Sequence, residues 1–161
     1  MGEVIKVGIA DLKLCKTPDK ITTVGLGSCV GIVLYSKSEK ICGLVHIMLP
    51  SSKEIKNNAN RAKFADTGIE DLILALEKNG LKRQSLFAKI AGGATMFQFS
   101  GKSDMGSIGT RNVKAVKEAL ESYHIQVVSE DTGKDYGRTI VFDPESKELL
   151  IRSAGKGDKS I

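Results

Sequence analysis

The 161-residue sequence has no tryptophan and only 5% aromatic residues. Proteins that bind single-stranded nucleic acid stack bases on aromatic side chains beside a basic groove. Here the lysines are scattered along the chain, and no aromatic cluster lies among them. We therefore expect no nucleic-acid partner, although the formal net charge is +5. A basic balance of this size is equally compatible with an acidic protein partner.

Long apolar runs are also missing. The longest uncharged runs, such as Ile41–Pro50, are far shorter than the roughly 20 residues that span a bilayer, so no membrane insertion is expected. The chain has three cysteines, an odd number, and its first residues lack the charged-then-apolar pattern of a secretory leader. These features favour free thiols in a reducing cytoplasm over a disulfide framework.

The composition is that of an ordinary globular protein, with 41% hydrophobic and 27% charged residues. A chain of this length can bury a sizeable core without disulfides or a metal. We see no internal repeat and no linker, so the sequence predicts a single domain over residues 1–161.

Apolar periodicity predicts an α/β domain richer in strand than in helix. A polar loop separates the apolar runs Val30–Tyr35 and Ile41–Leu49, which predicts a β-hairpin. The segment Ser51–Asn60 is predicted to be a mobile loop, and Ala154–Ile161 a frayed tail. The remaining expected elements are strands within Met1–Cys15, Lys20–Val24, Ser85–Ala91, His124–Glu130, Arg138–Phe142 and Glu148–Ser153, and helices over Asn60–Asn79 and Gly109–Tyr123.

The stretch Thr22–Pro50 holds the candidate chemistry. Cys29 ends a glycine-rich turn that begins at Gly25, where a sulfur can be exposed beside backbone N–H groups, as a thiol nucleophile requires. If the two apolar runs pair, His46 returns beside Cys29 and can serve as its base. The hydroxyl of Thr22 or Thr23 could hold the imidazole. The residues alone also allow a plain structural interpretation, with Cys29 a small buried side chain and His46 a core histidine.

Two other kinds of site find less support in this stretch. Cys29, Cys42 and His46, with Cys15 as a fourth ligand, could in principle bind a metal, but no C-x-x-C pair is present. The pair Gly25-x-Gly27 could suggest a dinucleotide turn, but the next glycine comes too late and an apolar strand follows instead of a helix. We expect no metal and no cofactor.

Several motifs, taken in order, closely resemble the chemoreceptor glutamine deamidases of bacterial and archaeal chemotaxis (CheD). The likeness covers about Val4 to Ser153. One departure is Lys134, where the family often has a second glycine after Gly133. The motifs are Thr23-x-Gly25-Leu26-Gly27-Ser28-Cys29-Val30, His46-x-Met48-Leu49-Pro50, Ala88-Lys89-Ile90-x-Gly92-Gly93-Ala94-x-Met96-Phe97, Ile108-Gly109-x-Arg111-Asn112, Glu130-Asp131-x-Gly133, Gly137-Arg138 and Phe142.

The resemblance implies a layered α/β sandwich of mostly antiparallel sheet with two main helices, similar to the catalytic domain of the cytotoxic necrotizing factor toxins. It also implies roles: Cys29 as nucleophile, His46 as base and Thr23 as the group that orients the imidazole. The turn residues Gly27 and Ser28 would then help to hold the oxyanion.

The activity implied is that of a protein-glutamine deamidase (protein-glutamine glutaminase). It would convert glutamine side chains of methyl-accepting chemotaxis receptors to glutamate through a thioester, with release of ammonia. A CheC-type chemotaxis phosphatase is the second implied partner. The alternative is an adaptor whose main role is to bind receptors and stimulate that phosphatase. The loops Ser51–Asn60 and Lys102–Gly109 are where we expect a helical substrate to dock.

Overall fold

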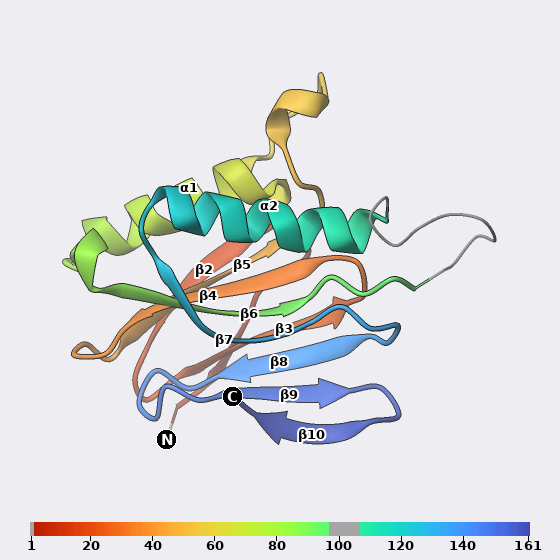
Figure 1. Cartoon of the computed structure of the whole chain (residues 1–161). Helices are drawn as coiled ribbons and strands as arrows, with labels where there is room; N and C mark the ends of the chain where they lie inside the picture. Colours follow the sequence, from red (N-terminus) through yellow and green to blue (C-terminus); the bar gives the residue numbers. More distant parts are fainter. Residues whose placement is uncertain (1, 97–106) are drawn as a thin grey trace.

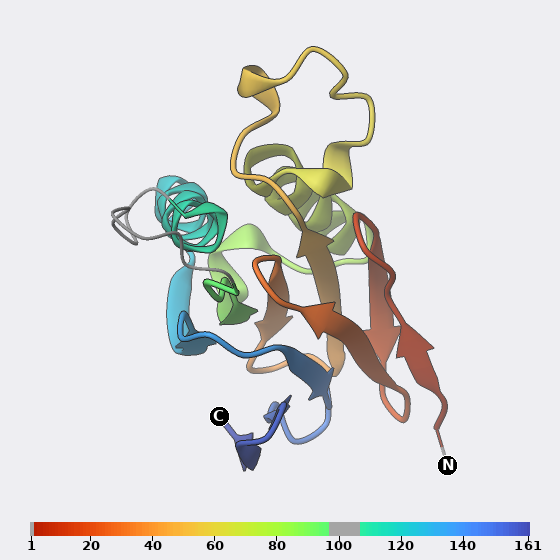
Figure 2. The ribbon, with the colours of Figure 1, turned by 90° about the vertical axis from the view of Figure 1, so that its right-hand side faces the viewer.

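Two β-sheets stack face to face, and two α-helices cover the outer face of one of them (Figure 1). The computed structural model describes residues 2–96 and 107–161. Seen from the end, the molecule has three layers: the helices, the sheet that they cover (the middle sheet) and the other sheet (the outer sheet) (Figure 2). The sequence prediction of a layered, mostly antiparallel sandwich with two main helices is confirmed.

The outer sheet has five strands in the order β1-β3-β8-β9-β10. β1 pairs with β3 in parallel, and the other neighbours are antiparallel. One face of this outer sheet packs on the middle sheet, and its other face is open to solvent. The strands are β1 (Val4–Lys6), β3 (Lys20–Leu26), β8 (Arg138–Phe142), β9 (Leu149–Ser153) and β10 (Gly157–Ser160).

The middle sheet has the order β2-β5-β4-β6-β7, in which only β6 and β7 are parallel. Every residue of its central strands β4 and β5 is buried. Both faces of these strands are covered, which explains why they read as continuous apolar runs without alternation. The predicted hairpin is confirmed as the β4–β5 pair. The strands are β2 (Leu12–Lys16), β4 (Val30–Ser36), β5 (Ile41–Ile47), β6 (Leu86–Gly92) and β7 (Gln126–Thr132).

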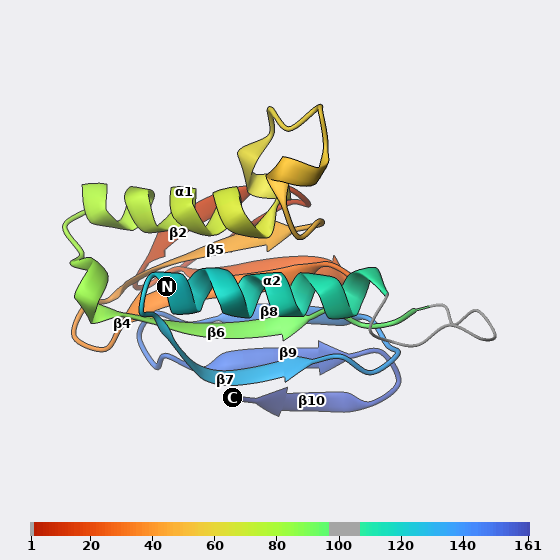
Figure 3. The same ribbon diagram turned by 45° about the horizontal axis from the view of Figure 1, so that its top comes forward.

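The helices α1 (Ala65–Lys78) and α2 (Ile108–Ser122) lie side by side along the middle sheet (Figure 3). Their apolar stripes meet one face of that sheet in a core that includes Val45, Leu72 and Leu120. The other face meets the outer sheet in a second core around Leu44 and Phe142. Because residues alternate between faces along a strand, consecutive residues of β4 and β5 serve different cores. In the part of the chain that the structure describes, no helix is long and apolar enough to cross a membrane.

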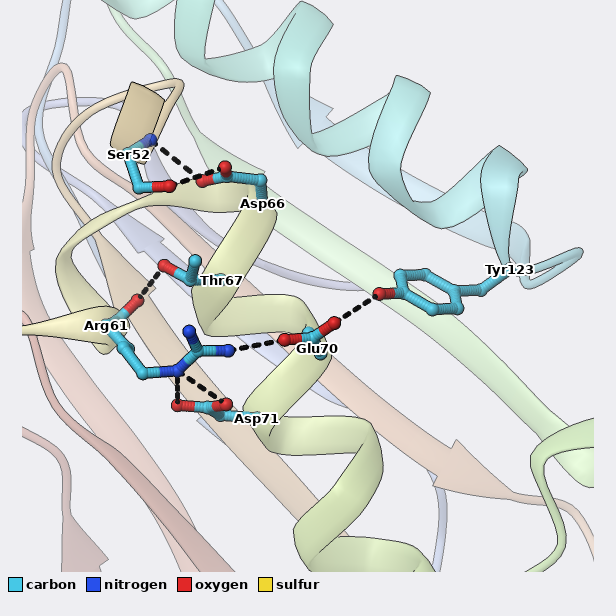
Figure 4. Close-up of polar contacts among 7 residues, drawn as sticks. All are labelled: Ser52, Arg61, Asp66, Thr67, Glu70, Asp71 and Tyr123. Atoms are coloured by element: carbon cyan, nitrogen blue, oxygen red, sulfur yellow. Dashed lines mark hydrogen bonds and ion pairs between the residues drawn. The ribbon is translucent and has the colours of Figure 1, made fainter. Parts of the chain in front are cut away.

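The segment after β5 is a loop over most of Ser51–Asn60, as predicted, but its beginning is fastened to α1. It contains the short 3₁₀ helices η1 (Ser52–Glu54) and η2 (Arg61–Lys63). Asp66 in the first turn of α1 accepts hydrogen bonds from the Ser52 amide at 3.0 Å and the Ser52 hydroxyl at 2.8 Å (Figure 4). The sequence prediction for Ser51–Asn60 therefore missed a local turn, because its anchor lies beyond the segment. The prediction also began the helix too early, at Asn60 instead of Ala65.

Polar contacts link α1 to η2 and to α2. The Arg61 guanidinium donates to Asp71 at 2.9 Å and to Glu70 on the same helix (Figure 4). The other carboxylate oxygen of Glu70 accepts from the Tyr123 hydroxyl, just after α2, at 3.4 Å. These groups are largely exposed, so each pair contributes little to stability on its own. Of these contacts, only the one between Glu70 and Tyr123 joins α1 to the end of α2.

The C-terminal residues form a strand, and the prediction of a frayed tail was wrong. Gly157–Ser160 pairs with β9 along its whole length as β10. All four residues are exposed, so no apolar pattern marked them; the free edge of β9 supplies the hydrogen bonds.

The backbone at Lys134 explains why the family often has a glycine at this position. Its φ of +64° lies in the left-handed region that glycine adopts most easily. Of the predicted docking loop Lys102–Gly109, residues 102–106 lie outside the described residues.

Candidate active site

Thr23 and His46 meet between the two sheets. Thr23 lies on β3 of the outer sheet and His46 on β5 of the middle sheet, and both are fully buried. The Thr23 hydroxyl oxygen lies 2.7 Å from Nδ1 of His46 and 2.7 Å from the carbonyl oxygen of Val7. The residues alone left Thr22 and Thr23 as equal possibilities, and the family resemblance indicated Thr23. The Thr22 hydroxyl donates to Ile140 O and makes no hydrogen bond to the imidazole.

The partners of Thr23 determine the tautomer of His46. A carbonyl oxygen can only accept, so the single hydroxyl hydrogen of Thr23 goes to Val7. The hydroxyl oxygen must then accept from Nδ1–H of His46. This leaves Nε2 without a hydrogen, with its lone pair available to take up a proton.

His46 is held neutral by its surroundings. Burial lowers the pKa of the imidazole from 6.5 to about 4, because a charged ring loses its hydration in the interior. Nε2 is buried and has no hydrogen-bond partner among the described residues. A buried acceptor without a donor carries a cost of roughly 1–3 kcal/mol. The ring is therefore a neutral base with one unsatisfied nitrogen.

Strand register brings Cys29 to the same face as His46. His46 lies directly opposite Gly31 of β4, and Cys29 is two positions before Gly31, so its side chain falls on the same face. Cys29 packs against the core between the sheets, on the side of the imidazole. Cys29 immediately precedes β4 and has no strand partner of its own, and its thiol is not hydrogen-bonded to the imidazole, whose Nε2 has no partner among the described residues.

Gly31, opposite His46, has no room for a side chain. A Cβ at this position would lie 2.9 Å from the Ile140 side chain and 3.6 Å from that of Thr23. Both contacts come from the outer sheet, so a side chain on Gly31 would push the sheets apart above His46. The position of Gly31 opposite the histidine depends on the strand pairing and not on the local sequence.

The turn that carries Cys29 is tied to the loop after β6. Ala94 N–H donates to Gly27 O and Gly93 N–H donates to Cys29 O, both at 2.8 Å. Gly92 has a φ of +114°, and a Cβ there would lie 2.2 Å from the Cys29 carbonyl oxygen. Only glycine permits this close approach. The Gly92–Gly93 break in the sequence thus serves to hold the backbone of the candidate nucleophile.

The side chain of Asn112 also holds this turn. It lies on α2 and is fully buried, with Nδ2 donating to Ser28 O at 3.0 Å and to Met48 O at 2.9 Å. Sequence reasoning quoted Asn112 as part of a motif and assigned it no role. A signal was present, because the buried stripe of α2 includes Gly109, Val116 and Leu120, and Asn112 is a polar residue within that stripe.

The N–H groups of the turn are not equivalent. Gly27 N–H donates to Gly25 O at 3.0 Å, so Gly27 shapes the turn and its N–H is occupied. We therefore correct the expectation that Gly27 contributes an oxyanion donor. Ser28 N–H and Cys29 N–H make no hydrogen bond to the backbone of another described residue.

Cys29 is a half-buried thiol whose pKa is raised by burial, an effect partly opposed by its own backbone N–H. Among the residues that the structure describes, no positively charged group offsets the desolvation of a thiolate here. The resting forms are therefore a neutral thiol and a neutral imidazole.

The other cysteines belong to the core. Cys15 and Cys42 lie directly opposite each other on β2 and β5 and are buried. Cys42 is thus a core residue of the strand that carries His46. Within residues 2–96 and 107–161 no three His, Cys, Asp or Glu side chains come close enough to hold a metal ion.

Comparison with known proteins identifies a family. A family model described as CheD chemotactic sensory transduction matches residues 48–153. A Lachnoclostridium phytofermentans protein named probable chemoreceptor glutamine deamidase CheD is 61% identical over 161 residues, 100% of both chains. The chemoreceptor glutamine deamidase CheD of Halalkalibacterium halodurans is 51% identical over 162 residues, again 100% of both chains. That of Bacillus subtilis is 51% identical over 159 residues, 98% of this chain and 96% of the relative.

A solved structure is similar in fold. The crystal structure of a Neisseria meningitidis protein of family DUF152 superposes with a TM-score of 0.54 at 10% sequence identity. The match covers 82% of this chain and 64% of that chain, so it spans less than two thirds of that protein. At this identity the likeness concerns the fold alone.

Proposed function

This chain belongs to the CheD family, and we propose that it converts glutamine side chains of chemotaxis receptors to glutamate. The relatives with half or more of their residues identical over nearly the whole length are named chemoreceptor glutamine deamidases. In this proposal Cys29 is the nucleophile, His46 the base and Thr23 the group that fixes the imidazole.

The single observation that supports these roles best is the state of His46. Its Nδ1–H is held by Thr23, its Nε2 is bare, and the ring lies between the two sheets, where Cys29 also packs. A purely structural histidine in the interior would gain by having both nitrogens satisfied. A base that must take a proton from a thiol needs one of them free.

The first half of the reaction forms a thioester. Nε2 of His46 removes the proton from the Cys29 thiol as the sulfur attacks the carboxamide carbon of the substrate glutamine. The N–H groups of Ser28 and Cys29, neither of which is bonded to the backbone of another described residue, donate to the oxyanion of the tetrahedral intermediate. The imidazolium then returns the proton to the amide nitrogen, the C–N bond breaks and ammonia leaves.

The second half restores the enzyme. Water attacks the thioester while Nε2 accepts one of its protons, and the thiolate leaves and regains that proton from the imidazolium. The product is a glutamate, which adds one negative charge to the receptor. Such a charge change is a local electrostatic switch in a signalling helix.

The raised pKa of Cys29 and the lowered pKa of His46 keep the site neutral between turnovers. Proton transfer is then coupled to substrate attack, and the resting sulfur is protected from oxidation, to which thiolates are most prone. The reaction needs no cofactor, because thiol, imidazole and water supply every group.

The direct test is incubation with a cytoplasmic receptor fragment, followed by mass spectrometry of its glutamine-containing peptides. Wild type is expected to convert glutamine to glutamate, and Cys29→Ala to be inactive. Cys15→Ala is the matched control, since it removes another cysteine away from His46. Equal conversion by wild type and Cys29→Ala would rule out the nucleophile.

We extend the proposal to location and partners. Receptor glutamines of this kind face the cytoplasm, where we place the protein, and the family resemblance adds a CheC-type phosphatase as a second partner. If the main role is instead that of an adaptor, Cys29→Ala would retain phosphatase stimulation and the chemotactic phenotype of wild type. Loss of the phenotype in Cys29→Ala would favour the enzyme.

A further inference from the structure

Three successive carbonyl groups of the turn, at Gly27, Ser28 and Cys29, are each held by a donor from another segment. Two of the donors are backbone N–H groups of the loop after β6. The third, at Ser28, is the side chain of Asn112 on α2. The middle carbonyl is therefore the one whose orientation depends on a replaceable side chain.

We propose that Asn112 is a positioning residue for deamidation, which aims the Cys29 N–H at the substrate oxyanion and holds the Cys29 turn against the strand of His46. This inference rests on the proposed function. It concerns the geometry of the machinery and not the identity of the nucleophile.

The orientation of the Asn112 amide is fixed by its partners. Both neighbouring atoms, Ser28 O and Met48 O, are carbonyl oxygens that can only accept. Nδ2 has two hydrogens and can satisfy both at once, and the opposite orientation would place three acceptors together. Asn112 thus joins two segments through one nitrogen.

The first hydrogen bond sets the direction of the Cys29 N–H. In a planar trans peptide the C=O of one residue and the N–H of the next point in opposite directions. Because Ser28 O points at Asn112 on α2, the Cys29 N–H points away from the helix. It reaches the side where its own sulfur lies, and its hydrogen bond to that sulfur opposes the rise in the pKa of the thiol. This is the donor that we assign to the oxyanion.

The second hydrogen bond reaches the base. Met48 follows β5 and is two residues beyond His46. With Ser28 and Met48 held on the same nitrogen, the residue before the nucleophile and the end of the base's strand cannot separate. A shift of about 1 Å in such a pair is enough to reduce the rate strongly.

The cost of Asn112 argues against a role in stability alone. Its Oδ1 is buried and has no hydrogen-bond partner among the described residues. A leucine at the same position of the buried stripe would bury more apolar surface and leave no orphaned oxygen on the side chain. A leucine, however, could not donate hydrogen bonds to the two carbonyl oxygens that Asn112 holds.

The experiment measures kcat, KM and thiol reactivity in Asn112→Ala and Asn112→Asp. We expect Asn112→Ala to lower kcat by roughly 10- to 100-fold, as loss of oriented oxyanion donors does, and to change KM by less than about threefold because the residue is buried away from substrate. In Asn112→Ala, a higher pH should be needed to reach the wild-type rate of Cys29 alkylation by iodoacetamide, because the Cys29 N–H is no longer held at the sulfur.

Asn112→Asp provides a readout that a structural role would not give. An ionised aspartate cannot donate to either carbonyl, whereas a protonated one donates to one of them. The ratio of Asn112→Asp activity to wild-type activity should therefore increase as the pH is lowered, and the ratio for Asn112→Ala should stay constant.

Val116→Ala is the matched control, one turn further along the buried stripe of α2. It is expected to lower the melting temperature while kcat stays within about twofold of wild type at a temperature where both are folded. Wild-type kcat in Asn112→Ala, or a pH-independent ratio in Asn112→Asp, would overturn the positioning role. If wild type deamidates no receptor fragment, the proposed function fails, and the alkylation shift then decides alone whether Asn112 positions the Cys29 N–H.

Discussion

Thr23 and His46 come from different sheets, and the 2.7 Å hydrogen bond between their side chains is a polar link across the core between those sheets. The same hydroxyl donates to Val7 O, so the imidazole is held in the tautomer with a bare Nε2. The candidate base is therefore oriented by the packing of the sandwich, and a change in the spacing of the sheets would alter it.

Thr23→Val should retain the fold and lose most of the activity. Valine matches the shape of threonine but cannot accept from Nδ1–H, which frees the ring to turn or change tautomer. We expect kcat to fall by roughly 10- to 1,000-fold. Thr23→Ser should retain much of it. Thr22→Val is the matched control, because its hydroxyl bonds only to Ile140 O in the outer sheet; an equal loss in both variants would contradict the assignment.

The alkylation of Cys29 should be slow at neutral pH. The pKa of the thiol lies above its ordinary value of 9.0 through burial, and the thiolate is the form that iodoacetamide attacks. The second-order rate should rise with pH up to and beyond 9. Mass spectrometry of the modified peptide would separate Cys29 from the buried cysteines. A fast, pH-independent reaction between about pH 5 and pH 8 would instead indicate a resting thiolate–imidazolium pair.

Burial of neutral His46 should make the protein less stable in mild acid. The folded-state pKa is about 4 and the ordinary value is 6.5, so between these values the unfolded chain binds the extra proton. The free energy of unfolding should fall as the pH drops from about 6.5 to about 4, by roughly 2 kcal/mol.

Urea unfolding of wild type and His46→Gln over this pH range would measure that effect. The substitution removes the titrating ring, so its curve should be flatter. The same substitution at exposed His124 controls for the loss of an imidazole elsewhere. Parallel curves for wild type and His46→Gln would contradict the prediction.

Gly92→Ala should be far more damaging than Gly80→Ala. Both glycines have positive φ, +114° and +94°, but a Cβ at Gly92 would lie 2.2 Å from Cys29 O and one at Gly80 meets nothing within 4 Å. We expect Gly80→Ala to cost about 1 kcal/mol of backbone strain and Gly92→Ala roughly 3 kcal/mol or more. Chemical unfolding measures both, and similar losses would mean that the Cys29 turn moves freely.

Local sequence determined the parts of this protein that depend on near neighbours. The continuous apolar runs of β4 and β5 predicted a buried hairpin, and the three-to-four spacing of apolar residues predicted both helices. The turn from Gly25 to Cys29 marked the candidate nucleophile. These features follow from the periodicity of side chains and from the backbone freedom of glycine, both of which act over a few residues.

Only the tertiary structure decided how the site is held. The hydrogen bond between Thr23 and His46, the tautomer of His46 and the place of Gly31 opposite the imidazole all depend on which strands pair and which sheets stack. The two hydrogen bonds of Asn112 span 84 and 64 residues of sequence, and β10 exists because β9 offers it a free edge. Hydrogen-bond partners far apart along the chain leave no periodic trace in it, so they become visible only when the fold brings them together.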